Sequence, residues 1–223
     1  QFIYDGLTSG SPQVIIAASF LLGQIYSSRI APADYLYRNF ERFYTLLGQL
    51  LLNFDNRAVH PTLLRAIGEM FLSPQFSDPA QNPLAADNLE VNGEPIGQSL
   101  RELLLMVTGQ LEQIDLTNKD DVRYGNQFAK NLSLVYGGYA KNFYCVENMT
   151  IERHQLLLLD KLAQTIYKLY PKIEPEVIQQ FAATCKLFGE RCSRKNNVIL
   201  NRASIHRLLK VIHEEPDVTA DPQ

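Results

Sequence analysis

TIERHQLLLLDKLAQTIYKLY, residues 150–170, is the stretch that decides the fold. Plotted at about 100° per residue, its apolar side chains fall in one wide arc, opposite most of its charged ones. Thr150 can cap the first turn, and Pro171 ends the helix because it has no N–H to donate. The arc is broader than a coiled-coil seam, so we predict a helix packed against two neighbours. Its members are Ile151, Leu156, Leu159, Leu162, Ala163, Ile166, Tyr167, Leu169 and Tyr170.

The same helical periodicity recurs along the chain, often with proline in the first turn, where its missing N–H costs nothing. The further predicted helices span about residues 11–29, 32–54, 61–72, 96–114, 122–143, 174–191 and 197–213. The first is apolar on nearly all sides, so we expect it to be sandwiched between other elements. Gly137-Gly138 predicts a kink or a tight helix contact. No stretch predicts a convincing strand, although Asn92-Gly93 is a hairpin signal.

Eight helices without a strand predict an all-α protein. Taken in pairs, they start near residues 12, 61, 120 and 175, whereas HEAT and armadillo units repeat every ~40–47 residues. The pattern resembles a degenerate HEAT-type repeat in spacing only, since no sequence motif recurs clearly. We predict an irregular HEAT- or armadillo-like α-solenoid, with a globular helical bundle as the structural alternative.

The domain organisation follows from the breaks between helices. We predict one helical domain over residues 1–214 and an acidic tail over 215–223 that frays. Residues 73–97, with prolines at 74, 79, 83 and 95, form a long segment without periodicity, which is typical of a functional or disordered loop. Because the chain opens on Gln1 rather than Met, we expect it to be part of a longer protein.

Composition places the chain among ordinary globular proteins: 46% of residues are apolar and 20% are charged. No apolar run approaches the ~20 residues that cross a bilayer. The three cysteines are sparse and odd in number, and Cys185 and Cys192 lie too far apart on one helix to bridge. We therefore predict an intracellular protein, in the cytoplasm or nucleus, with reduced thiols.

Motifs that carry catalysis are not found in the sequence. It has no GxxxxGK[ST], GxSxG or GxGxxG motif, and its histidines and cysteines lack zinc-site spacing. Asp120-Asp121 resembles half of a magnesium-binding motif, but no second acidic cluster faces it, so we interpret it as a solvated cap before the helix. Aromatic residues of segment 32–54 are interpreted as core. We predict no enzymatic activity, no cofactor and no metal.

The strongest functional signal is a reversal of charge near the end of the chain. Residues 186–213 carry seven basic side chains and one acidic one, and the acidic tail follows. On a helix, several of these cations share one arc beside a buried face, which suits an acidic peptide or a polyanion. The alternative interpretation is a solvated outer face. The basic stripe consists of Arg191, Arg194, Lys195, Arg202, His206, Lys210 and His213.

Fold class and charge together predict a non-enzymatic α-helical scaffold that mediates protein–protein interaction within a larger assembly. Its partner would be another protein or a peptide segment, and the basic stripe favours an acidic one. The alternative is a nucleic-acid-binding helical domain acting through the basic stripe. No membrane contact is predicted.

Reversing two charges of the basic stripe tests whether it binds an anionic partner. Arg202→Glu with Lys210→Glu should abolish that binding without lowering the melting temperature, because neither residue belongs to the apolar arc. The measurement is binding to DNA, RNA or an acidic protein at rising salt, where screening should weaken the difference. Unchanged binding by a folded double variant would place the interface elsewhere.

Overall fold

The computed structural model describes residues 1–76, 82, 84, 89–143, 149–191 and 205. Over these residues the chain forms eight α-helices, three short 3₁₀-helices and one two-stranded hairpin. The α-helices are α1 (Phe2–Leu7), α2 (Pro12–Ser27), α3 (Ala33–Asn53), α4 (His60–Phe71), α5 (Ile96–Thr108), α6 (Lys119–Phe143), α7 (Met149–Tyr167) and α8 (Pro175–Arg191). The short elements are η1 (Arg57–Val59), η2 (Pro74–Phe76), η3 (Gly109–Gln113), β1 (Glu90–Val91) and β2 (Glu94–Pro95). The predicted all-α class is confirmed.

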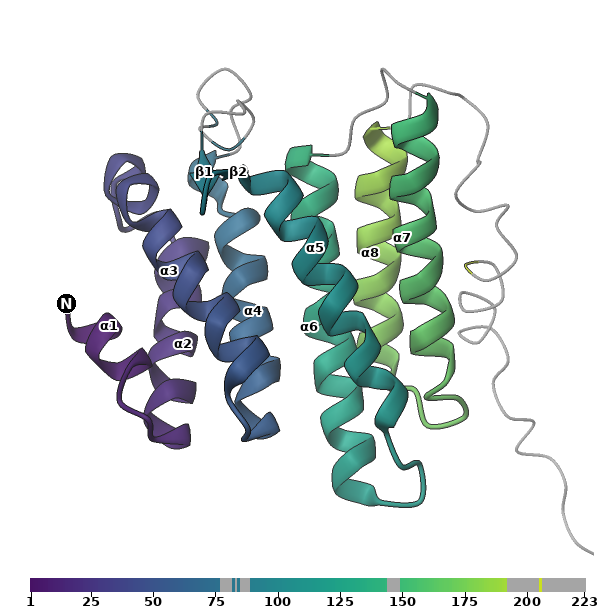
Figure 1. Ribbon diagram of the computed structural model, residues 1–223. Coiled ribbons are helices and arrows are strands. Elements are labelled where there is room, and N and C mark those ends of the chain that lie inside the picture. The colour runs from purple at the N-terminus through teal and green to yellow at the C-terminus, as the bar shows by residue number, and fades with distance from the viewer. Residues whose placement is uncertain (77–81, 83, 85–88, 144–148, 192–204, 206–223) are drawn as a thin grey trace, which may run out of the picture.

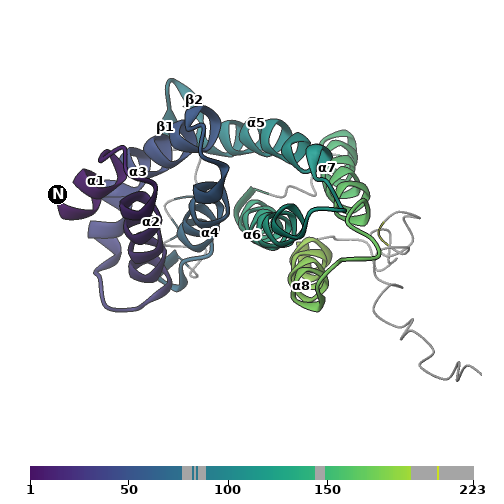
Figure 2. The same ribbon diagram turned by 90° about the horizontal axis from the view of Figure 1, so that it is seen from below.

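The helices lie in two layers (Figures 1 and 2). Helices α2, α4, α6 and α8 stand side by side in chain order, and the most extensive helix contacts join these neighbours. Helices α1, α3, α5 and α7 form the other layer, which runs along the upper side of Figure 2. The predicted starts near 12, 61, 120 and 175 are therefore the starts of one whole layer.

Hydrogen bonds fix the direction of neighbouring helices. The Asn131 Nδ2 donates to the Pro61 carbonyl at 2.7 Å, near the start of α4, and the Asn142 Nδ2 donates to the Phe71 carbonyl at 2.8 Å, at its end. Helices α4 and α6 therefore run parallel. On the other side of α6, the Thr184 hydroxyl of α8 donates to the Ser133 carbonyl at 2.6 Å.

Helix α5 of the second layer runs antiparallel to α6. Thr108, at the end of α5, shares a hydrogen bond of 2.9 Å with the buried Tyr136 hydroxyl in the middle of α6. Gly97, near the start of α5, packs against the Phe143 ring at the end of α6. One α5 hydroxyl thus satisfies the buried phenol of Tyr136, a group that would be costly to leave unpaired.

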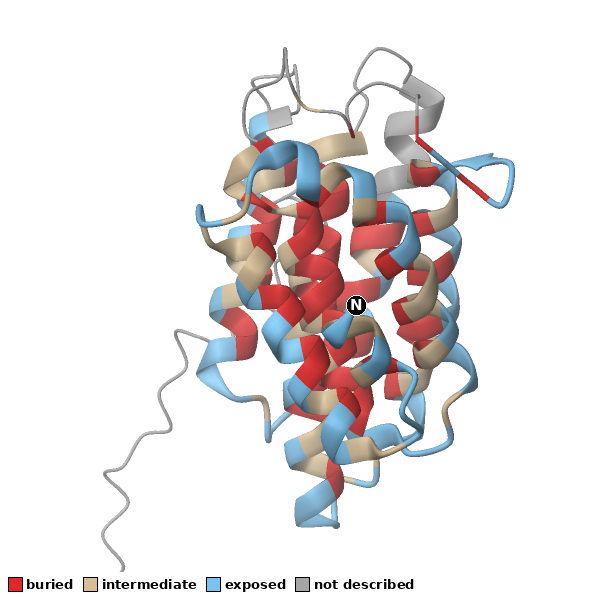
Figure 3. Ribbon diagram, turned by 90° about the vertical axis from the view of Figure 1, so that its left-hand side faces the viewer, coloured by how far each residue is buried: buried red, intermediate tan, exposed pale blue. Residues whose placement is uncertain are grey.

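The core draws buried residues from the helices of both layers, which Figure 3 colours red. Helix α7 contributes Leu159, Leu162, Ala163 and Ile166, all fully buried, while Lys161 is exposed. The predicted arc is confirmed at these positions. The end of the arc differs from the prediction: α7 stops at Tyr167, and of the last two members Leu169 is buried but Tyr170 is 45% exposed.

The two adjacent glycines of α6 lie at a tight helix contact, and α6 runs without a break from Lys119 to Phe143. A Cβ on Gly138 would lie 2.6 Å from the Cβ of Phe71 in α4. Both atoms are attached directly to backbone, so no side-chain rotation could relieve that overlap. Glycine at 138 therefore sets how closely α4 and α6 approach.

Segment 73–97 contains more structure than its lack of periodicity predicts. Phe76, Leu84 and Val91 are buried, so described parts of the segment pack on the core. Asn92 and Gly93 both have positive φ, 56° and 81°, and form the turn between β1 and β2. The expectation that the chain has no strand is corrected here, and the Asn-Gly signal was the one that indicated it.

Two further expectations concern the ends of the chain. The sequence did not predict α1, a single short helix of six residues. The predicted helix over residues 197–213 and the acidic tail lie outside the described residues, apart from Ile205. Within the described part, no helix combines the length and apolar character needed to cross a membrane.

The contact at Gly138 gives a stability prediction. Gly138→Ala should lower the free energy of unfolding by about 1–3 kcal/mol, because the added methyl group forces α4 and α6 apart. A matched control is Gly48→Ala in α3, where a Cβ would meet nothing within 4 Å. That variant should be more stable by about 0.5–1 kcal/mol through helix propensity. Urea unfolding followed by circular dichroism measures both, and equal changes would contradict the tight contact.

Candidate functional site

The basic stripe lies almost wholly outside the described residues. This holds for Arg194, Lys195, Arg202, His206, Lys210 and His213, and of Arg191 only the backbone, the last residue of α8, is described. Ile205, from the apolar arc of the same segment, is described and is fully buried. The stripe therefore stays a prediction from the sequence.

The aromatic residues of α3 belong mainly to the core, as predicted. Phe40 makes edge contacts with Tyr26 of α2 and Phe71 of α4, with ring centroids 5.9 and 5.0 Å apart. The Tyr26 hydroxyl donates to the Leu36 carbonyl at 2.7 Å, which satisfies this buried group. Tyr35 is the exception, at 53% exposure. This cluster joins three helices and leaves little aromatic surface for a ligand.

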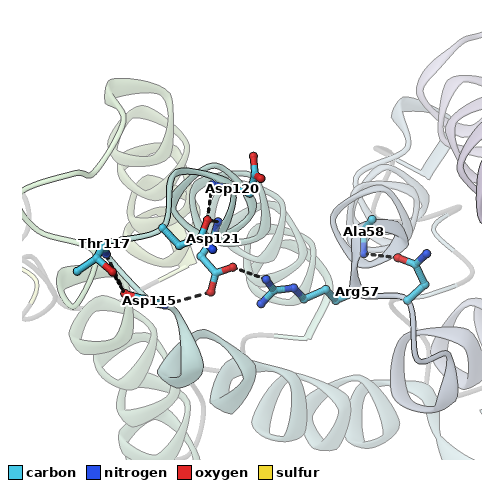
Figure 4. A network of polar contacts seen from close by, with 8 residues as sticks. Arg57, Ala58, Asp115, Thr117, Asp120 and Asp121 are labelled. Atoms are coloured by element: carbon cyan, nitrogen blue, oxygen red, sulfur yellow. Dashed lines mark hydrogen bonds and ion pairs between the residues drawn. The ribbon is translucent and has the colours of Figure 1, made fainter.

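Asp121, in the first turn of α6, links the loop between α5 and α6 to the segment between α3 and α4 (Figure 4). Its carboxylate forms an ion pair with Arg57 of η1 and accepts a hydrogen bond from the backbone N–H of Asp115 at 3.2 Å. The hydrogen bond from Arg57 lowers the pKa of the Asp121 carboxyl. Asp121 is buried and lies within α6, so the expected solvated cap is corrected; the side chain of Asn118 caps the helix instead. The Arg57–Asp121 ion pair therefore acts as a structural clamp between these two loops.

His60 lies beside this clamp, at the start of α4. One ring nitrogen is 3.1 Å from the Phe54 carbonyl, and the other is 3.4 Å from the Tyr124 hydroxyl. Arg57 stacks over the Tyr124 ring, 5.0 Å from its centroid. Burial lowers the pKa of His60, so its neutral form is favoured in the folded protein. These contacts hold one end of α4 against α6, so His60 has a structural role.

The outer face of α2 is the feature that best fits a binding surface. Helix α2 contains no charged residue, and the side turned away from the core exposes Val14 (44%), Phe20 (47%) and Leu21 (41%). The expected sandwich is found in part: α2 lies between α1 and α4, but in the described structure its outer side is open to solvent. We define the α2 outer face as Gln13, Val14, Ala17, Phe20, Leu21 and Gln24, all exposed.

The neighbouring helix α4 borders this face with one charge of each sign. The Arg65 guanidinium lies 5.2 Å from the centroid of the Phe20 ring and forms a long ion pair of 3.9 Å with Glu69. The α2 outer face thus has an apolar centre with glutamines at both ends and a charged border on one side. Protein-binding surfaces commonly combine an apolar centre with a polar rim.

Sequence reasoning missed the α2 outer face although the signal was present. A helix that is apolar all round predicts burial, and periodicity alone does not distinguish burial within the chain from burial by a partner. Among the described side chains, no three His, Cys, Asp or Glu residues gather as metal ligands would. Comparison with known proteins gave no match to a family model, to a curated protein or to a solved structure.

The environment of His60 gives a pH prediction. Well above its ordinary pKa near 6.5, the histidine is neutral in both the folded and the unfolded chain, and stability is at its full value. Below pH 6.5 the unfolded chain binds the proton first, so the free energy of unfolding should fall until the lower folded-state pKa is passed. His60→Gln should remove this dependence, at the cost of about 1 kcal/mol of hydrogen bonding at every pH.

Urea unfolding of both proteins between pH 7.5 and 5 measures the difference. The other three histidines are common to both proteins, so their contributions largely cancel. Identical pH dependence in wild type and His60→Gln would show that burial of His60 has no effect on its protonation.

Proposed function

We propose that the chain is a non-enzymatic α-helical scaffold that binds another protein within a larger assembly and docks it on the α2 outer face. The observation that carries the proposal is an uncharged helix with Val14, Phe20 and Leu21 exposed on one side. Burying such side chains is favourable by about 25 cal/mol per Å² of apolar surface removed from water. A partner that covers this face supplies the burial that the chain itself leaves incomplete.

We also propose that the two layers form an irregular HEAT- or armadillo-like repeat. The support is geometric: α4, α6 and α8 run parallel, and α5 returns antiparallel beside α6. The starts of α2, α4, α6 and α8 at residues 12, 60, 119 and 175 give unequal spacings, and the largest contains segment 73–97. Stacked helix pairs expose extended surfaces, and protein recognition is a frequent use of them.

The partner surface should be apolar with hydrogen-bonding groups at its edges. Phe20 is the anchor, since aromatic side chains contribute strongly where a partner excludes water. Gln13 and Gln24 at the ends of the face can donate and accept hydrogen bonds without imposing a charge. An intracellular location stays a prediction; the buried thiol of Cys185, whose pKa burial raises to about 12, fits a structural, unreactive cysteine.

Nucleic-acid binding through the basic stripe is the alternative function. Its support is the excess of six positive charges over residues 186–213. The two functions differ in their response to salt, because counterion release makes nucleic-acid binding steeply salt-dependent, whereas an apolar interface is not weakened by salt.

The test replaces the apolar centre of the face without altering charge. Phe20→Gln with Leu21→Gln should remove at least one protein that co-purifies with the wild-type chain, measured by quantitative mass spectrometry and confirmed by direct binding of that protein. Because both side chains are about half covered and Phe20 contacts Arg65, the double variant should lose about 1–3 kcal/mol of stability, and circular dichroism checks that it stays folded.

A matched control exists on the opposite layer. Leu105 and Met106 of α5 are adjacent and exposed by 39% and 54%. Leu105→Gln with Met106→Gln should leave the co-purifying protein in place. Loss of the same protein from both double variants, or from neither, would contradict docking on the α2 outer face.

A further inference from the structure

A second site lies on α3, in a hollow of about 430 Å³ between three elements. Tyr4 of α1 lines it on one side and Asn92, in the hairpin turn, on another. Helix α3 supplies the remaining residues, among them Arg38, Glu41 and Arg42. None of the lining residues belongs to α2, so this hollow is separate from the α2 outer face and does not depend on the function proposed there.

The Arg42 guanidinium is held in place by Tyr4. It stacks over the tyrosine ring with 3.7 Å between the guanidinium carbon and the ring centroid. Stacking occupies one face of the planar group and leaves its edge N–H donors free. With no acidic residue paired to it in the described part of the chain, Arg42 presents these donors to the hollow.

Arg38 lies one turn before Arg42, so the two guanidinium groups project from the same side of α3. It too forms no ion pair with a described residue. Two like charges at this spacing repel each other, and an anion bound between them would relieve the repulsion. Planar guanidinium groups also match a carboxylate or phosphate with two parallel hydrogen bonds.

We propose that this hollow, the α3 arginine site, binds an acidic side chain of a peptide segment. Arg38 and Arg42 take the oxyanion. Around them, Glu41 and Gln49 can accept from backbone N–H groups of the peptide, and Asn92 can pair with its carbonyls. Leu46 and the body of Tyr4 give apolar contact beside these polar groups. A lone inorganic anion would use only the arginines, whereas a peptide can also form hydrogen bonds with Glu41, Gln49 and Asn92, so a peptide uses more of the lining.

The experiment measures binding of fluorescein-labelled hexaglutamate to the full chain by fluorescence anisotropy at low salt. Arg38→Glu with Arg42→Glu should weaken binding roughly tenfold, because two attractive charges become repulsive. Arg42→Lys should weaken it by a smaller factor, since an ammonium group keeps the charge but not the planar fork. Both arginines are exposed, so melting temperatures should stay close to wild type. A peptide with one phosphoserine among glycines distinguishes phosphate from carboxylate as the preferred anion.

Two matched variants separate this site from general charge attraction. Arg123→Glu with Lys130→Glu changes the net charge equally at exposed positions of α6 and should leave binding nearly unchanged. Arg202→Glu with Lys210→Glu removes charge from the basic stripe. The proposal is overturned if hexaglutamate does not bind, if the α6 variant weakens binding as much as the α3 variant, or if only the stripe variant does. The last outcome would leave docking on the α2 outer face untouched.

Discussion

The close approach of α4 and α6 is the constraint on which the rest of the structure depends. Gly138 lets the backbone of α6 lie against Phe71, and Asn131 and Asn142 hydrogen-bond to carbonyls near the two ends of α4. The apolar contact holds the two helices together, and the directional bonds fix their register. Because α6 also carries the Tyr136 hydroxyl bound by α5 and the Ser133 carbonyl bound by α8, it orients both layers at once. A small shift of α6 would break several of these hydrogen bonds at once and leave buried polar groups without partners. This makes the arrangement specific as well as stable.

Much of the helical layout could be predicted because each long helix carries its own periodicity and start signal. Prolines 12, 61 and 175 lie in the first turns of α2, α4 and α8, as the sequence predicted. The features that the sequence did not predict depend on residues far apart in the chain or on segments too short to show a period. Helix α1 is too short to show a full apolar period, and the hairpin rests on two residues per strand whose pairing depends on the Asn92-Gly93 turn. The Gly137-Gly138 signal had two readings, and only the position of Phe71 on another helix decides between them.

The candidate sites were harder to predict than the helices, for a physical reason. Periodicity reports which side chains avoid water, whereas a binding surface is defined by side chains that the fold leaves uncovered. Val14, Phe20 and Leu21 look in the sequence like core residues, and they are exposed because no helix of the described part of the chain packs on that side. Arg38 and Arg42 look like an ordinary solvated face, and only Tyr4 and Asn92, from distant parts of the chain, enclose them. Both sites arise from tertiary neighbours.

The two described surfaces differ in the physics that would hold a partner. On the α2 outer face the driving force is apolar burial, which salt does not screen, and the neutral glutamines at its ends add no net attraction or repulsion. At the α3 arginine site the attraction is electrostatic, and exposed charges are screened beyond about 10 Å at 0.1 M ionic strength. A partner that used both would gain affinity from the first and orientation from the second, since two guanidinium groups on one helix turn can donate to an oxyanion in few arrangements. Such a partner would lose orientation before affinity as salt rises. A partner held by charge alone would lose both together.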